Sequence, residues 1–437
     1  MSTAKSKLSS HPGGPENPYD LHTIADAFDK LQTWIAQYGD VISIPPLKRK
    51  DPCFFINNAD MLKHILVSNH KNYVKGAAFD RVKLLLGNGI IVSDGTFWRK
   101  QRRMIQPAFG KEVIAEIFQN MKGCNFAILD DWQKRAAEDG TINITDLTNE
   151  LALEIILRAI FSIDFDEITR GDDGNPFSIL TDNSTRDLQL AVKFRELKQL
   201  LQKFIDKRRQ ATDRPNDFLT AFIEARDKDS GEAMTDKELL DELVTLIVAG
   251  SETSAATMNW VWYLLSQHPE VEAKVHAEID AASFDDAPDF MQCIELSYLK
   301  QVIEEALRLY PPVWLYSRKA IDDDTVGSFE IPAGTDIFIS PYFLHRNKDY
   351  WDDADAFNPE RFSDENIKKR HKFAFIPFSA GPRRCIGDFF GTVEAQIHFA
   401  ILARHFKLRL QNTEALELEP EVNLRTKNPF IMKIERR

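Results

Sequence analysis

The chain has 437 residues, of which 43% are hydrophobic, 28% charged and 11% aromatic. This composition is that of an ordinary globular protein, with room for one large core or two to three domains, and it excludes a disordered chain. The formal net charge of −12 argues against nucleic acid as a general partner.

Cysteine usage and the N-terminal sequence indicate a cytoplasmic protein. The four cysteines stand far apart and form no C-x-x-C pair, which argues against a disulfide framework or a structural zinc site; they are Cys53, Cys124, Cys293 and Cys385. Neither the first thirty residues nor any later segment contains an uncharged apolar run of membrane length. We therefore expect a soluble protein in the cytoplasm, with no membrane anchor.

The N-terminal part of the chain is predicted to pass from a mobile segment into two strands. Residues 1–19 are rich in Ser, Gly and Pro and are predicted to be mobile, whereas residues 20–437 are predicted to form one domain. The stretches "DVISIPP" (40–46) and "CFFIN" (53–57) favour short strands, and "ADMLKHILVS" (59–68) favours a helix.

The next part of the chain is mainly helical, and its clearest element begins after Thr235. Helical patterns run from Gly95 to about Arg226, and "TDKE" then places Glu238 three residues after Thr235, the arrangement of a capping box. The pattern continues to Pro269, which predicts a helix of about 32 residues and about 48 Å. Since this helix is apolar on most sides, we expect it to cross the centre of one large domain.

The C-terminal third continues with helices and a short strand-and-turn section. Helices are predicted over "EVEAKVHAEIDAA" (270–282), "LKQVIEEALRLYPP" (299–312) and "CIGDFFGTVEAQIHFAILARHF" (385–406). Short strands are predicted around "GSFEIPAGTDIFIS" (327–340). The predicted fold class is therefore mainly α with a small β portion.

The stretch "FSAGPRRCIG" (378–387) places a thiol among arginines and glycines just before the last helix. A thiolate must be stabilised before it can ligate a metal or act as a nucleophile, and a helix N-terminus favours negative charge. Gly381 and Gly387 permit backbone conformations that other residues resist, which lets a bulky partner approach the sulfur. Taken alone, Cys385 is equally consistent with a buried structural cysteine.

The residues around Cys385 carry a specific pattern. Phe378, Gly381, Arg383, Cys385 and Gly387 match F-x-x-G-x-R-x-C-x-G, and in this the sequence resembles the cytochrome P450 family, whose cysteine ligates haem iron. The resemblance implies a single-domain cytochrome P450 fold with a long central helix. It also implies haem b, iron protoporphyrin IX, as the cofactor.

Two further motifs extend the resemblance. "EALR" matches the family's E-x-x-R, with Glu305 and Arg308 one helical turn apart on one face. "FNPERF" resembles the segment that supplies Arg361, which implies a Glu305–Arg308–Arg361 charge network behind the cysteine loop. Such a network is plausible in a protein interior only if it is fully paired.

The resemblance also assigns side chains to the haem propionates. "WRKQR" matches W-x-x-x-R and places Trp98 and Arg102 at i and i+4 on one helix face, although outside this context the run would indicate a solvated basic face. Arg318 in "YSRKA" and Arg383 are expected to serve the propionates as well. A guanidinium suits this role because it donates two parallel hydrogen bonds to a carboxylate.

The stretch "AGSET" (249–253) lies in the long helix and matches the family's [AG]-G-x-[DE]-T. The resemblance implies that Ala249 and Gly250 border a groove over the iron. It also implies that Glu252 and Thr253 are the acid–alcohol pair that delivers protons during dioxygen activation. A tolerated kink at Gly250 is the structural alternative.

The implied activity is a haem-thiolate monooxygenase that inserts one atom of dioxygen into a small organic substrate, by hydroxylation or oxidative O-demethylation. Electrons are expected from a separate ferredoxin or flavodoxin with its NAD(P)H-dependent reductase. The basic residues Arg99, Lys100 and Arg103 and the run 368–372 are expected to dock this donor, with ordinary solvated surface as an equal alternative.

The substrate pocket is expected, by position in the family, to be lined by Phe79, Leu246, Ile247, Val313, Trp314 and Phe430. These side chains are apolar, which favours a lipophilic substrate such as a fatty acid, terpenoid or steroid. Two other classes of function stay open. One is a haem-thiolate ligand-binding or sensor protein without turnover, against which the Glu252–Thr253 pair argues; the other is an all-α binding protein without haem, in which Cys385 is structural.

Overall fold

The computed structural model describes residues 12–21, 26–49, 51–138, 140–170, 175–177, 188–285 and 287–437, and the first eleven residues of the predicted mobile segment lie outside it. The later residues of that segment lie against the first strand region. The amide of Ser43 donates to the carbonyl of Gly13 at 2.9 Å, and the amide of Tyr19 donates to the carbonyl of Pro45 at 2.8 Å.

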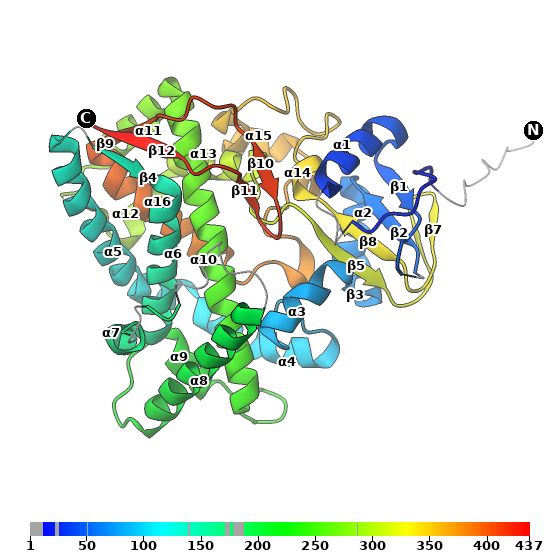
Figure 1. Ribbon diagram of the computed structural model, residues 1–437, viewed down its shortest axis with the longest axis horizontal. Coiled ribbons are helices and arrows are strands. Elements are labelled where there is room, and N and C mark those ends of the chain that lie inside the picture. Colours follow the sequence, from blue (N-terminus) through cyan, green and yellow to red (C-terminus); the bar gives the residue numbers. More distant parts are fainter. Residues whose placement is uncertain are drawn as a thin grey trace, which may run out of the picture.

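Helices make up most of the described chain, which confirms the predicted fold class (Figure 1). The α-helices are α1 (Ala27–Tyr38), α2 (Ala59–Lys63), α3 (Asp80–Leu86), α4 (Gly95–Ile105), α5 (Lys111–Ala137), α6 (Ile144–Phe161), α7 (Phe165–Ile168), α8 (Leu188–Gln210), α9 (Phe218–Glu224), α10 (Asp236–Gln267), α11 (Pro269–Ala281), α12 (Phe290–Glu295), α13 (Ser297–Leu309), α14 (Pro341–Leu344), α15 (Asp364–Lys369) and α16 (Asp388–His405). Within the described ranges, no helix combines the length and apolarity needed to cross a membrane.

The strands are short; those of the largest sheet lie beside the helical part, whereas β4, β9 and β12 lie among the helices (Figure 1). They are β1 (Val41–Ile44), β2 (Cys53–Ile56), β3 (Tyr73–Lys75), β4 (Thr141–Asn143), β5 (Tyr316–Ala320), β6 (Asp324–Val326), β7 (Phe329–Ile331), β8 (Asp336–Ile339), β9 (Phe406–Leu410), β10 (Leu418–Pro420), β11 (Leu424–Thr426) and β12 (Ile431–Arg436). The largest sheet has the order β1-β2-β8-β5-β3, with β2 and β8 parallel. The others are β4-β12-β9, the hairpin β10-β11 and the hairpin β6-β7.

The long helix α10 runs through the middle of the molecule, as its sequence predicts (Figure 1). It has 32 residues and begins after Thr235, whose side chain and that of Glu238 form the predicted capping box. It ends before Pro269, the first residue of α11. A Cβ at Gly250 would lie 2.9 Å from two side-chain atoms of Ile156, so glycine allows the close approach of α6 and α10.

The predicted charge network is present between α13 and the segment that follows α14. Arg308 donates from Nε to Glu305 Oε2 at 2.6 Å and from Nη2 to Oε1 at 2.8 Å, and both side chains are fully buried. Its remaining hydrogen bonds go to the carbonyls of His345, Ala354 and Ala356. Arg361 completes the network, with its Nε 3.4 Å from Glu305 Oε1.

We predict that Arg308→Ala lowers the free energy of unfolding by about 3–5 kcal/mol, because it leaves the Glu305 carboxylate buried without its main partner. Urea denaturation measures this loss. Arg135→Ala is the matched control, since it removes an exposed ion pair with Asp131 and is expected to cost less than about 1 kcal/mol. Equal losses in the two variants would contradict the prediction.

Candidate active site

The loop that carries Cys385 is fixed by backbone geometry. Gly381 has φ +70°, and a Cβ there would lie 2.0 Å from the carbonyl oxygen of Leu66, so both conformation and space require glycine. The amide of Cys385 donates to the carbonyl of Phe378 at 2.9 Å, which closes the loop. Gly387 is the N-cap of α16 with φ −94°, so the unusual backbone conformation expected at this position is absent.

The thiol of Cys385 is accessible but not electrostatically favoured as a thiolate. The residue is exposed, yet the protein atoms around it remove enough hydration that burial raises the pKa of the thiol. A hydrogen bond from the Gly387 amide and the charges of Arg102 and Arg384 lower it, and burial outweighs them. The helix N-terminus and the arginines thus favour the thiolate, but less than burial disfavours it. A metal ion would supply what is missing, because metal binding displaces the proton.

Arg383 contacts Trp98, and both residues are expected beside the haem propionates. The guanidinium of Arg383 lies 4.0 Å from the ring centroid of Trp98, donates to the carbonyl of Ser93 at 2.6 Å and pairs with Asp94. Burial first, and also the nearby charges of Arg318 and Arg102, lower the pKa of Arg383 to about 10. The effect of Arg318 and Arg102 on the pKa of Arg383 indicates that these cations lie near one another, in a positive environment.

Lys75 is a member of this cluster that sequence analysis misses. In the β3–β5 register Lys75 lies directly opposite Arg318, although like charges at such positions destabilise a sheet. Burial, followed by the charges of Arg318 and Arg383, holds the pKa of Lys75 well below its usual value, and burial lowers that of Arg318. A single lysine in "YVKG" does not indicate a site by itself, because Arg318, the residue opposite it, lies more than 240 residues away in the sequence.

We call Lys75, Arg102, Arg318 and Arg383 the cation cluster. Arg102 donates to the carbonyl of Arg384 at 2.9 Å, in the cysteine loop. Among the described residues, Asp94 pairs with Arg383, and no carboxylate lies within ion-pair distance of the other three cations. The cluster has four cations and one paired carboxylate, and a bound anion would stabilise such partly buried positive charge. Beside an accessible thiol, a group with two carboxylates and a metal fits this set of side chains, as haem would.

The middle of α10 presents the predicted acid and alcohol. Leu246, Ala249 and Thr253 lie at i, i+3 and i+7 and are only partly buried, whereas most of this helix is buried. The Thr253 hydroxyl donates to the Ala249 carbonyl at 2.7 Å, so its oxygen remains able to accept a hydrogen bond. Glu252 turns to the β10–β11 hairpin, where Arg425 Nη2 donates to Oε1 at 2.7 Å and Asn423 donates to Oε2. Sequence analysis predicts neither partner.

The helix after Cys385 contacts α10 beside this pair. Ser254 donates to Glu394 of α16 at 2.5 Å, and both side chains are buried. The contact brings the residues that follow the cysteine loop next to Thr253. Burial raises the pKa of Glu394 to about 8, against the smaller effect of the Ser254 hydrogen bond.

The residues predicted to line the pocket do not all share one environment. Val313 is 37% exposed, Phe79 and Leu246 are partly buried, and Ile247 is buried. Trp314 is buried and donates to the carbonyl of Glu421 at 2.9 Å. Phe430 stacks on Tyr263 with centroids 4.7 Å apart, which places it in an aromatic core near the C-terminal half of α10. Trp314 and Phe430 are thus packed among other side chains, and their place in a substrate pocket stays a prediction.

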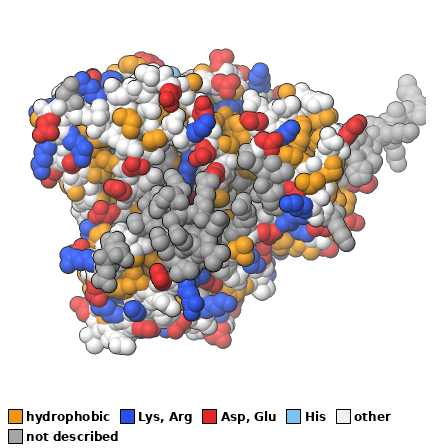
Figure 2. Space-filling view, viewed as in Figure 1, with side chains coloured by type: hydrophobic (Ala, Val, Ile, Leu, Met, Phe, Trp, Pro, Cys, Tyr) orange, Lys and Arg blue, Asp and Glu red, His pale blue; other side chains and the backbone are white. Residues whose placement is uncertain are grey.

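Two of the residues predicted to dock a donor already have acidic partners. Lys100 pairs with Glu232 at 3.0 Å, and Arg103 pairs with Asp227 and Asp229 at 2.6 Å each. In the run 368–372, Lys369 pairs with Glu365 at 2.6 Å. On the face drawn in Figure 2, basic and acidic side chains are interspersed.

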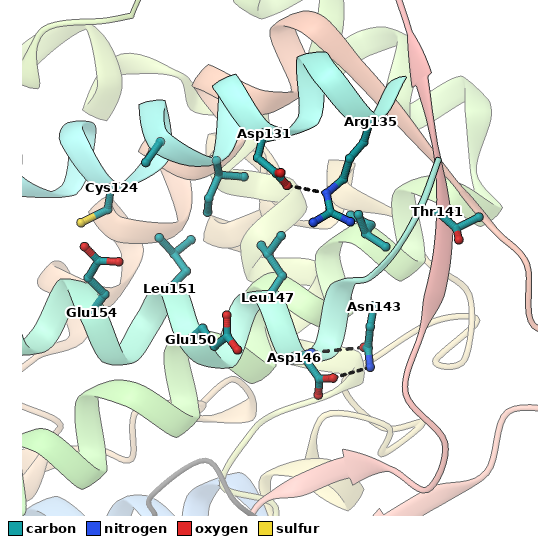
Figure 3. Close-up of a pocket in the computed structure, with 13 residues that line it drawn as sticks. Cys124, Asp131, Arg135, Thr141, Asn143, Asp146, Leu147, Glu150, Leu151 and Glu154 are labelled. Carbon is teal, nitrogen blue, oxygen red and sulfur yellow. Dashed lines mark hydrogen bonds and ion pairs between the residues drawn. The ribbon is translucent and has the colours of Figure 1, made fainter. Parts of the chain in front are cut away.

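A separate pocket of about 410 Å³ lies between α5, β4 and α6, and none of the predicted site residues lines it (Figure 3). Three of its four carboxylates have local partners. Asp131 pairs with Arg135, Asp146 accepts from Asn143, and Glu154 pairs with Arg158. We assign it no role.

Glu394 makes the stability of the fold depend on pH. Its folded-state pKa of about 8 exceeds the ordinary 4.5, so its contribution is complete below about pH 4.5 and is lost as the pH rises through about 8. We predict that Glu394→Gln removes this part of the pH dependence and gains stability relative to wild type at pH 9. Urea denaturation at pH 5 and pH 9 tests this; parallel profiles for the two proteins would refute it.

Comparison with known proteins gives a consistent family. The family model described as Cytochrome P450 matches residues 21–434. The cyclooctatin synthase of Streptomyces melanosporofaciens is 31% identical over 99% of this chain and 98% of its own length. The cyclooctat-9-en-7-ol 5-monooxygenase of the same organism is 32% identical over 85% and 83%. The pentalenene oxygenase of Streptomyces avermitilis is 29% identical over 86% of each chain.

Solved structures agree on the fold. The crystal structure of the cytochrome P450DA heme domain superposes with a TM-score of 0.86, at 23% identity over 98% of each chain. With the family match, the cysteine loop and the charge network, this leads to one conclusion. The chain belongs to the cytochrome P450 family of haem-dependent, oxygen-incorporating oxidoreductases.

Proposed function

We propose that this protein is a haem b monooxygenase that hydroxylates, or oxidatively O-demethylates, a lipophilic terpenoid with electrons from a separate ferredoxin- or flavodoxin-type donor. The carrying observation is the exposed Cys385 beside the cation cluster, three of whose four cations lack a carboxylate partner among the described residues. Bound haem supplies the iron at which dioxygen is activated. One oxygen atom enters the substrate and the other leaves as water, which consumes two electrons and two protons.

The chain's own residues fall into three groups in this proposal. The sulfur of Cys385 holds the iron, and the cation cluster, stacked in part on Trp98, binds the propionates. Thr253 orients a proton donor on the distal side, because its hydroxyl is fixed to Ala249 and can still accept. Glu252 replenishes protons from solvent.

The named relatives favour a terpenoid, and two exposed apolar side chains favour a lipophilic substrate in general. Relatives named for cyclooctat-9-en-7-ol and pentalenene are about 30% identical over most of this chain. Val313 and Val422 are 37% and 68% exposed, and the backbone around them is joined because the Leu424 amide donates to Pro312 at 2.8 Å. Two accessible apolar side chains on adjoining loops suit a hydrocarbon surface.

The direct test is incubation of the haem-loaded protein with a ferredoxin, its reductase, NADPH and isotopically labelled dioxygen. Pentalenene and cyclooctat-9-en-7-ol are the probes. The proposal predicts one labelled oxygen atom in the product. Binding of a probe without any labelled product would favour a ligand-binding or sensor protein.

We predict that Thr253→Ala keeps the haem absorbance but slows product formation by about 10²-fold, while donor oxidation continues and releases hydrogen peroxide. The reason is loss of the hydroxyl that orients the proton donor. Thr257→Ala, one turn along α10, is the control, because its hydroxyl also donates to a helix carbonyl at 2.8 Å but is buried. Product per electron pair equal in Thr253→Ala and wild type would rule out this role.

We also predict that Lys75→Met stabilises the protein without haem and weakens haem binding in the loaded protein. Without haem, removal of one of two facing cations should stabilise the fold by about 0.2–1 kcal/mol. With haem, loss of a propionate partner should increase haem release to apomyoglobin. Lys71→Met, at an exposed position four residues earlier, should change neither value. Slower or unchanged haem release in Lys75→Met would show that Lys75 does not hold the cofactor.

A further inference from the structure

We propose that Arg425 and Asn423 are positioning residues for Glu252, so that the β10–β11 hairpin holds the acid that supplies protons to the reaction. This inference rests on the proposed function, which gives Glu252 its role. It extends the site to a C-terminal element that carries none of the sequence motifs.

The contacts fix the carboxylate at both oxygens. Arg425 Nη2 donates to Glu252 Oε1 at 2.7 Å, and Asn423 Nδ2 donates to Oε2. The Glu252 side chain is 26% exposed and that of Arg425 is 31% exposed, while Asn423 is buried. Two donors from one short hairpin leave the carboxylate little freedom to rotate, and one side of the pair still reaches solvent.

The hairpin itself is anchored to rigid parts of the fold. The Leu424 amide donates to the carbonyl of Pro312 at 2.8 Å, and the Trp314 indole donates to the carbonyl of Glu421 at 2.9 Å. The Trp260 indole of α10 donates to the carbonyl of Leu424 at 3.4 Å, and Leu424 is fully buried. Arg425 and Asn423, on either side of Leu424, are therefore held at a fixed distance from α10.

Opposing effects act on the pKa of Glu252. Burial raises the pKa of Glu252, and Glu421 raises it further, whereas the charge and hydrogen bond of Arg425 and the Asn423 hydrogen bond lower it. An acid that must give up and regain a proton in each turnover needs a pKa near the working pH. Loss of Arg425 should therefore make Glu252 release its proton less readily and hold it in a less defined position.

The first test is an infrared titration of the Glu252 carboxyl in protein labelled with ¹³C-glutamate, with Glu252→Gln to assign the band. The midpoint should move to higher pH in Arg425→Gln and return most of the way in Arg425→Lys. Lys427→Gln is the matched control, since Lys427 follows β11 and pairs with Glu417 instead. Should Arg425→Gln not fold, Asn423→Ser removes the other donor and should shift the midpoint in the same direction. An unchanged midpoint in the folded variant overturns the inference.

The second test follows dioxygen consumption by the haem-loaded protein with a ferredoxin, its reductase and NADPH, in H₂O and D₂O. Arg425→Gln should show a larger solvent isotope effect and more hydrogen peroxide per electron pair than wild type, and Arg425→Lys should lie between them. Identical values in Arg425→Gln and wild type contradict the inference. If wild type yields no labelled product from any probe, the proposed function fails, and the infrared titration still decides whether Arg425 positions Glu252.

Discussion

The candidate site places an exposed cysteine beside a cluster of cations that has one carboxylate partner, Asp94, among the described residues. Burial raises the pKa of Cys385, and the nearby arginines and the Gly387 amide do not compensate. Lys75 and Arg318 meanwhile face each other across two strands at a cost to the sheet. Both conditions are unfavourable in isolation, and a ligand that brings a metal cation to the sulfur and carboxylates to the cations relieves both. The charges at the site therefore fit haem, the cofactor that the family implies.

Buried contacts elsewhere in the fold hold these groups in fixed relative positions. The buried Glu305–Arg308 pair joins α13 to the segment 345–361. The Ser254–Glu394 contact joins the helix that follows Cys385 to the helix that carries Thr253, and Gly250 lets α6 pack closely on it. Each of these is a short-range contact between distant parts of the chain. Cys385, Glu252 and Thr253 thus lie on helices and loops that are joined by buried contacts.

Sequence patterns predicted the elements whose signals are local. The capping box at Thr235 and the proline at 269 bounded α10, and the cysteine motif located the ligand loop. Contacts between distant parts of the chain were missed: β12 pairs with β4, Lys75 lies opposite Arg318, and Arg425 binds Glu252. The contacts of Phe430 were missed for the same reason, because its aromatic neighbours Trp260 and Tyr263 are on α10 and not beside it in sequence. The sequence motifs identified the reaction class. The side chains that hold the motif residues in place, such as Arg425 for Glu252, were identified only from three-dimensional contacts.

The most direct measurement of the central claim is X-ray absorption at the iron edge of the purified, haem-loaded protein, together with a Cys385→Ser variant. The account predicts one sulfur among the nearest neighbours of iron in the wild type and none in the variant. Iron coordinated in the wild type by nitrogen and oxygen alone would contradict the account, because the cysteine loop would then have no part in holding the metal.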